Sequence, residues 1–153
     1  MAEARIVKSA DGEVYERLWR FKHGSLTGGR FDFMVGNIGY LQGPPLHVHD
    51  DQDDTFYVLE GVLTVQVGDK VMEVGPGDFV SVPPGVPHTF DNTKKDQPPV
   101  KVCNLMTPGG LDAQFRDISA LNEPRDSPKV AAMRKKYGVS TVGPTLGVKL
   151  GLV

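Results

Sequence analysis

The 153-residue sequence has a single cysteine, Cys103, and no long apolar run. One cysteine cannot form an internal disulfide, and it is typical of a protein kept in a reducing compartment. No stretch approaches the ~20 apolar residues that a membrane-spanning helix needs. Residues 1–5 also lack the apolar segment of a signal peptide. We therefore expect a cytoplasmic protein with no membrane partner.

Basic charge is not in excess either. Lysine and arginine number 17 against 19 acidic residues, which gives a net charge of −2, and the one basic cluster is 134–136. Nucleic-acid-binding domains carry larger basic patches, so we expect no nucleic-acid partner. The 18 glycines and 12 prolines are too many for a helix bundle and favour a fold with frequent turns.

Alternation of apolar and polar residues predicts strands along much of the chain. The clearest cases are 30–38, 55–67, 79–82 and 100–106, and shorter N-terminal strands are predicted at 5–7 and 14–21. After residue 108 the pattern becomes helical. Ser127 followed by Pro128 is a typical helix start, and Gly138 is placed to end that helix.

Three of the four histidines lie between residues 43 and 92. His47 and His49 are two residues apart, so on a strand their side chains share one face. Neutral imidazole is the commonest metal ligand in proteins. A third imidazole from a later strand and a carboxylate between them would complete a set of four ligands, so this stretch predicts a metal site.

Two spaced motifs carry a resemblance to the cupin superfamily. The first reads His-any-His, a carboxylate, six residues, Gly, and is matched by His47, His49, Asp54 and Gly61, with Asp where the family usually has Glu. The family's earlier glycine is displaced, because Leu41 stands at its position. The second motif is matched at every spacing by Gly77, Pro83, Gly85, His88 and Asn92. The ending at 136–146 is similar to tails of bacterial quercetinase-like cupins, so the chain resembles a single-domain, type 2 cupin of that group.

The resemblance implies an all-β fold, a cupin antiparallel β-barrel of the jelly-roll type with six to eight strands and short C-terminal helices. We expect one cupin domain over 1–153. Its barrel core should span about 30–106, with N-terminal strands at 5–21 and a helical tail at 108–153.

The resemblance also implies the ligands His47, His49, Asp54 and His88 for one divalent transition metal. Nitrogen and carboxylate donors suit Fe, Ni, Mn, Co, Cu and Zn alike, so the metal is left open. Aspartate is one methylene shorter than glutamate. Asp54 would therefore bind directly only if its strand moved inward, and otherwise through a water. In quercetinase-like cupins the motif carboxylate takes a proton from the substrate, a catalytic role that Asp54 could fill if burial and neighbouring acids raised its pKa.

The function implied first is that of a quercetinase-like dioxygenase that cleaves an aromatic or enolic small molecule with dioxygen. Two alternatives stay open. Other cupins use the metal as a Lewis acid for polyketide cyclisation or for isomerisation, and a non-catalytic cupin would only bind a metal or a small ligand.

The expected substrate pocket includes residues that share strand parity with the ligands. Phe56 and Val58 follow Asp54, and Phe90 follows His88. Such a lining suits a planar or apolar substrate, and the motifs contain no arginine or lysine to bind a phosphosugar.

Two further expectations concern the N-terminal part. His23 stands in a glycine-rich stretch and is expected to be a solvated loop histidine, although some dioxygenase cupins place a histidine from this region near the metal. The apolar content of Tyr15, Leu18, Trp19 and Phe21 exceeds what the outside of one barrel needs, which favours a homodimer.

Overall fold

The computed structural model describes residues 4–16, 18–125 and 127–153, whose strands form two sheets. The first sheet has the order β1-β2-β3-β10-β5-β8, and the second has the order β11-β4-β9-β6-β7. The strands are β1 (Val14–Tyr15), β2 (Trp19–His23), β3 (Asp32–Ile38), β4 (His47–His49), β5 (Asp53–Glu60), β6 (Leu63–Val67), β7 (Lys70–Val74), β8 (Phe79–Val82), β9 (His88–Asp91), β10 (Val100–Thr107) and β11 (Val139–Thr141). The helices are the 3-10 turn η1 (Ser25–Thr27), α1 (Leu111–Leu121), α2 (Pro128–Lys136) and α3 (Leu146–Lys149).

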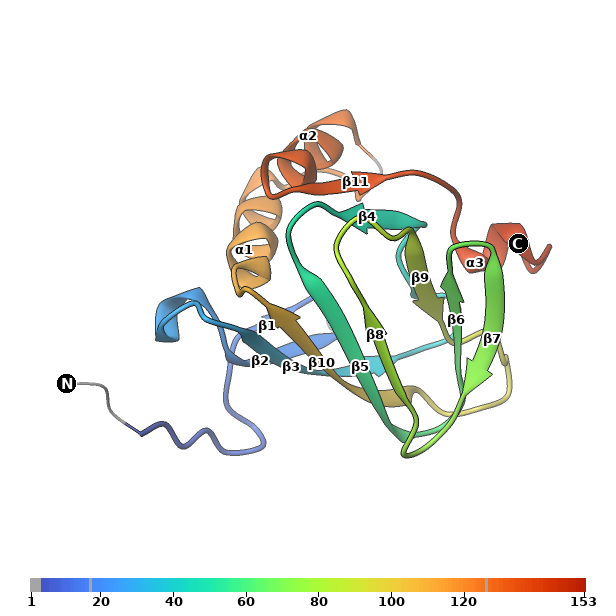
Figure 1. The fold of residues 1–153 in the computed structure, drawn as a ribbon, viewed down its shortest axis with the longest axis horizontal. Coiled ribbons are helices and arrows are strands. Elements are labelled where there is room, and N and C mark those ends of the chain that lie inside the picture. Colours follow the sequence, from blue (N-terminus) through green and yellow to red (C-terminus); the bar gives the residue numbers. More distant parts are fainter. Residues whose placement is uncertain (1–3, 17, 126) are drawn as a thin grey trace.

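The two sheets face each other around one interior, as Figure 1 shows. Strands β3 to β10 lie within the expected core region, and the ladders between named strands are antiparallel. The all-β jelly-roll barrel with short C-terminal helices is thus confirmed. Three further strands lie outside that core, so the described chain has more strands than the six to eight expected.

Strand β10 shows how the sequence builds the interior. It lies between β3 and β5, and its residues alternate between buried and half-buried positions. Val100, Val102 and Met106 are completely buried on its inner face. Full burial of each such side chain contributes roughly 1.5–3 kcal/mol. The inner position between them is taken by a polar residue, Asn104, which belongs to the site described below.

The expected strand at 5–7 is wrong. Residues 4–8 form no strand, and the side chain of Ile6 is 86% exposed. A two-residue apolar pair without alternation has no inner face to bury, so nothing holds it against a sheet. The strand expected at 14–21 is divided into β1 and β2, and Glu16 between them has a positive φ of 53°.

The tail expected to be helical contains a strand. Helix α2 begins as predicted, with the Ser127 side chain accepting a hydrogen bond from the backbone of Val130 and Pro128 in the first turn. Gly138, at φ 74°, follows the helix, and β11 then pairs with β4. Residues 139–141 are rich in β-branched side chains, and β4 offers a strand edge for them. Figure 1 shows α1, α2 and β11 together at one end of the barrel, beside β4.

The aromatic residues of the N-terminal strands pack against other residues of the same chain. Trp19 is 5% exposed and meets Phe90 edge-on, with ring centroids 5.8 Å apart. It lies over Gly36, where a β-carbon would come within 2.5 Å of the indole ring. Leu18 and Phe21 are buried as well. These side chains therefore leave no apolar surface for a partner, and the homodimer stays a prediction without this support.

Within the described ranges, no helix is long and apolar enough to cross a membrane.

Candidate metal centre

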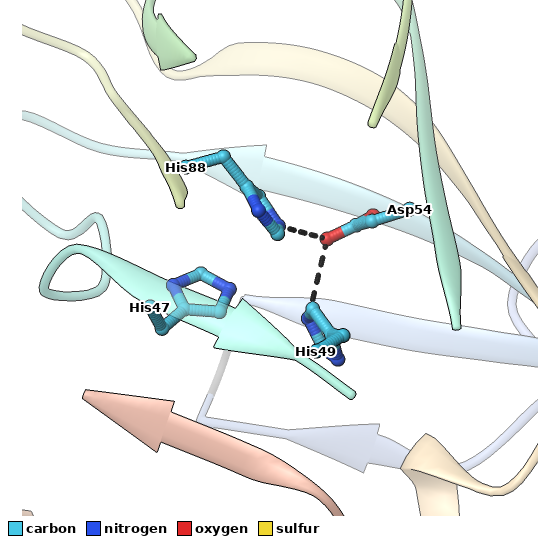
Figure 2. Close-up of side chains that lie close together, drawn as sticks. All are labelled: His47, His49, Asp54 and His88. Atoms are coloured by element: carbon cyan, nitrogen blue, oxygen red, sulfur yellow. Dashed lines mark hydrogen bonds and ion pairs between the residues drawn. The ribbon is translucent and has the colours of Figure 1, made fainter. Parts of the chain in front are cut away.

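Three strands bring the four motif residues to one point inside the barrel. His47 and His49 come from β4, Asp54 from the start of β5, and His88 from the start of β9. One ligand atom from each lies within 4.8 Å of those of the other three, and all four side chains are buried. Figure 2 shows them pointing toward one another. The residues that the sequence places in separate motifs thus converge.

Two of the imidazoles are oriented by the backbone. The Nδ1 atom of His47 lies 2.8 Å from the Pro45 carbonyl oxygen, and that of His88 lies 2.8 Å from the Val86 carbonyl oxygen. A carbonyl oxygen can only accept, so each Nδ1 must carry the proton and donate it. The Nε2 atoms are then the ones left to face the centre. Histidines that bind metals usually donate the proton of their other ring nitrogen to such an acceptor.

The third imidazole is held by a side chain. Nδ1 of His49 lies 3.2 Å from Oε1 of Gln52, and the Gln52 amide donates to the carbonyl oxygen of Pro108 at 2.9 Å. Gln52 therefore links a candidate ligand to the segment that leads into α1. The three imidazoles and the carboxylate together fit a divalent transition metal, because their nitrogen and oxygen donors converge on one point. The Nδ1 atom of each imidazole is already hydrogen-bonded, which fixes the orientation of the ring.

Asp54 reaches the centre despite its short side chain. Its Oδ2 atom lies 3.0 Å from Nε2 of His88 and 3.5 Å from Nε2 of His49. Its other oxygen, Oδ1, accepts a hydrogen bond of 2.6 Å from the Asn104 side chain. Asn104 is the polar residue on the inner face of β10, and its role was not predicted. The signal was present, since a polar side chain interrupts an otherwise apolar inward pattern.

The charges of the centre follow from burial and from these contacts. Burial, and then the nearby His88 and His49, lower the pKa of His47 to about 3, so this imidazole is neutral. Burial alone would raise the pKa of Asp54, but hydrogen bonds from His49 and His88 outweigh it and hold the pKa below its ordinary value. Burial likewise opposes protonation of His88, yet its hydrogen bond to Asp54 raises its pKa. The raised pKa expected for Asp54 is therefore wrong for the metal-free protein.

The displaced motif glycine has a structural reason. At Gly43 a β-carbon would lie 1.9 Å from the carbonyl oxygen of Phe90, so the chain that leads to β4 passes directly against β9. Only glycine allows so close an approach. Leu41, at the usual position of the family glycine, has a positive φ of 54°.

A cavity of about 80 Å³ opens beside the cluster and is lined by His47, His49 and Asp54. Of the three residues expected to form the substrate pocket, Phe90 lines it. Phe56 and Val58 do not, because they are buried in the hydrophobic core, 2% and 1% exposed. Parity predicted their inward face correctly, but successive inward residues on a strand are roughly 6.6 Å apart, which places them deeper in the barrel.

The rest of the cavity wall comes from outside the motifs. The apolar residues are Leu18, Trp19, Pro44, Pro45, Leu111, Phe115 and Val139, and the polar or charged ones are Glu16, Asn104, Gln114, Arg125, Arg134 and Thr141. The two arginines lie outside the motifs, which contain no arginine or lysine, and so were not predicted as part of the site. No local pattern marked them, since only the fold brings the C-terminal segment over the barrel.

His23 is not part of the cluster formed by the described residues. It is the last residue of β2 and not a loop residue, and it is half-buried. Its Nδ1 lies 2.9 Å from the Phe31 carbonyl oxygen, and its ring stacks on that of Phe31 with centroids 4.0 Å apart. These contacts give His23 a structural role.

Comparison with known proteins supports a cupin domain in the part of the chain that holds the four candidate ligands. Residues 39–106 match the family model described as Cupin domain. The chain is 31% identical over 72 residues to quercetin 2,3-dioxygenase of Bacillus subtilis, a match that covers 47% of this chain and 20% of that protein. It is 34% identical over 76 residues to a probable oxidoreductase, virH, of Hypocrea virens, covering 49% and 35%. The matches therefore span a fifth and about a third of the lengths of these two relatives.

A solved structure shares the fold. A cupin protein from Bacteroides fragilis superposes with a TM-score of 0.57 at 16% identity, covering 72% of this chain and 88% of that one.

Proposed function

We propose that this chain, whose residues 39–106 match the cupin domain model, is a metal-dependent dioxygenase of the quercetinase-like type. The observation that carries the proposal is the convergence of His47, His49, Asp54 and His88 on one buried point beside a cavity. The names of the two curated relatives, a dioxygenase and a probable oxidoreductase, point to the same class of reaction. Dioxygen and an aromatic or enolic small molecule are the proposed substrates.

The four residues would hold one divalent transition metal, with Fe, Ni, Mn, Co, Cu and Zn all compatible with the donors. When bound, such a metal supplies redox or Lewis-acid chemistry at the cavity floor. The chain itself supplies the orientation. Two backbone carbonyls and Gln52 fix the imidazoles, and apolar side chains form part of the cavity wall beside them.

Asp54 is the proposed proton acceptor. Asn104 holds its Oδ1 atom, which leaves Oδ2 turned toward the centre. In the proposed reaction Oδ2 takes the hydroxyl proton of the substrate. The hydrogen bonds that lower its pKa need protons on the Nε2 atoms of His49 and His88, and a lone pair used for ligation cannot carry one. These two hydrogen bonds to Asp54 would therefore be absent from a metal-loaded site.

The first experiment combines elemental analysis of the purified protein with an oxygen electrode, using quercetin and 2,3-dihydroxybenzoate as enolic and phenolic probes. We expect about one redox-active metal ion per chain and oxygen uptake with at least one probe. Turnover with zinc and without oxygen would instead favour the cyclase or isomerase alternatives. A protein that binds ligand but no metal would favour the non-catalytic alternative and refute the proposal.

Substitutions of Asp54 separate proton transfer from ligation. Asp54→Asn keeps the size but removes the basicity, so we expect most of the metal to stay and turnover to fall ~10²–10⁴-fold, the usual contribution of a general base. Asp54→Glu, which restores the residue usual in the family, should be tolerated. Loss of metal from Asp54→Asn, with activity proportional to occupancy, would make Asp54 a ligand only.

A cytoplasmic location and a homodimer remain predictions. Light scattering at micromolar concentration tests the second, and a monomeric mass would contradict it.

A further inference from the structure

Two arginines stand at the entrance of the cavity. Arg134 lies in α2 and Arg125 in the segment between α1 and α2. Both line the cavity beside the candidate metal centre, and both also line an adjoining outer groove of about 550 Å³. They therefore lie at the boundary shared by the cavity and the groove.

Within the described part of the chain, the positive charge at this boundary is only partly balanced. Nη2 of Arg125 lies 4.0 Å from a carboxylate oxygen of Glu16, which also lines the cavity. Arg134 is half-buried, and among the described residues no carboxylate oxygen lies within 4.0 Å of its side-chain nitrogens. Burial, and next the charge of Arg125, lower the pKa of Arg134. Counting only residues 4–16, 18–125 and 127–153, two guanidinium groups beside one carboxylate leave room for one negative charge.

The other residues that line the cavity indicate which further properties a ligand should have. Trp19, Phe90 and Phe115 provide aromatic surface in the cavity that the arginines and His47 and His49 also line. Gln114 is 4% exposed and lines the cavity, and its Oε1 atom is buried without a hydrogen-bond partner in the described part of the chain. Buried polar atoms are rarely left without a partner, so Oε1 is an acceptor available to a ligand. Sites for drug-sized molecules have volumes of roughly 300–1,000 Å³, so a cavity of about 80 Å³ favours a small ligand.

We propose that the substrate is a small aromatic or similarly apolar carboxylic acid, whose carboxylate is bound by Arg125 and Arg134 while its reacting end lies at the histidines. This inference rests on the proposed function and specifies its substrate class. Guanidinium groups bind carboxylates through paired, charge-assisted hydrogen bonds. A monoanion matches the single unbalanced charge better than a phosphate monoester, which carries about −1.5 to −2.

The test measures binding, by calorimetry on the purified protein, of benzoate, of uncharged benzamide and of inorganic phosphate. The variants are Arg134→Gln, Arg125→Gln and the double variant. Lys135→Gln is the matched control, since it removes one charge from the same helix at an exposed residue that does not line the cavity. Because the Arg125 side chain is 43% exposed, Arg125→Gln keeps the test valid if Arg134→Gln fails to fold.

We expect benzoate to bind the original protein and Lys135→Gln equally, and to bind each arginine variant about 10-fold more weakly, which is about 1.4 kcal/mol. Benzamide should bind all forms as weakly as the double variant binds benzoate. Equal benzoate affinity in the double variant, or no benzoate binding to the original protein, would overturn the inference. Tighter binding of phosphate than of benzoate would overturn the assignment to carboxylates.

Metal content, measured on the same samples, separates this inference from the proposed function. Arginine-dependent benzoate binding by a protein that takes up no metal would refute the metal-dependent enzyme alone. If the metal-loaded protein bound benzoate with the same affinity in the arginine variants as in the original, only the substrate class would be refuted.

Discussion

The floor of the cavity, formed by β4, β5 and β9, differs from its cap, formed by α1, α2 and β11, in how firmly each is built. All four residues of β9 are buried, whereas α2 buries only Val130. The floor lies within the family match at residues 39–106, and the cap lies outside it. The floor thus has the rigidity that a metal site needs, and the cap supplies the side chains that select what reaches it.

The largest effect that sharpens this comparison is expected at His88 in the floor. His88→Ala removes one of the four candidate ligands, while the hydrophobic core stays intact. Partners of metal ligands alone contribute ~10–100-fold to affinity, so we expect the loss of a ligand to weaken metal binding by at least about 100-fold. Elemental analysis after gel filtration measures this loss, and circular dichroism should show an unchanged barrel.

His23→Ala is the matched control, because His23 is a half-buried histidine outside the cluster. It should keep its metal. Full occupancy in His88→Ala would exclude His88 from the site.

A second effect concerns pH. The pKa of His88 is raised by its hydrogen bond to Asp54, although burial opposes this. Below that pKa the imidazole carries a proton that a metal must displace, so metal affinity should fall as pH falls, by about tenfold per pH unit for one proton. Competition with a chelator across the acidic to neutral range measures the slope. A flat profile would show that no proton is displaced from the site.

A third effect joins the two regions. Gln52 accepts from His49 and donates to the carbonyl oxygen of Pro108, just before α1. Gln52→Ala should lower metal affinity by about 10-fold, since it frees the outer nitrogen of a ligand. Gln52→Glu keeps an acceptor for His49 and should lose less. Equal losses in both variants would mean that the link to Pro108 matters more than the contact with His49.

The smallest effect is expected in the cap alone. Ser127→Ala removes the side chain that caps the start of α2 and should lower the free energy of unfolding by about 1 kcal/mol. Ser127→Asp, which can also cap, should be nearly neutral. Metal affinity should not change in either variant. A parallel loss of metal would show that the floor depends on the cap, against the comparison made above.

The parts that were predictable from the sequence are those with a strict spacing. The two motifs identified His47, His49, Asp54 and His88, and alternation identified the inner face of β5, where Asp54 lies. Alternation gives the face of a residue but not its depth, which is why Phe56 was misplaced. A three-residue strand such as β11 shows no periodicity, and its pairing with β4 joins residues about ninety positions apart.

That pairing has a consequence for how the chain can be shortened. Val139 lies opposite His49 and Thr141 opposite His47, so β11 covers the outer edge of the strand that carries two candidate ligands. A chain cut at residue 106, the limit of the family match, would leave this edge open. Open edges recruit strands from other molecules, and a shift of one residue would turn both imidazoles to the outside. The tail therefore protects the register of the histidines, and a minimal barrel without it would be expected to aggregate.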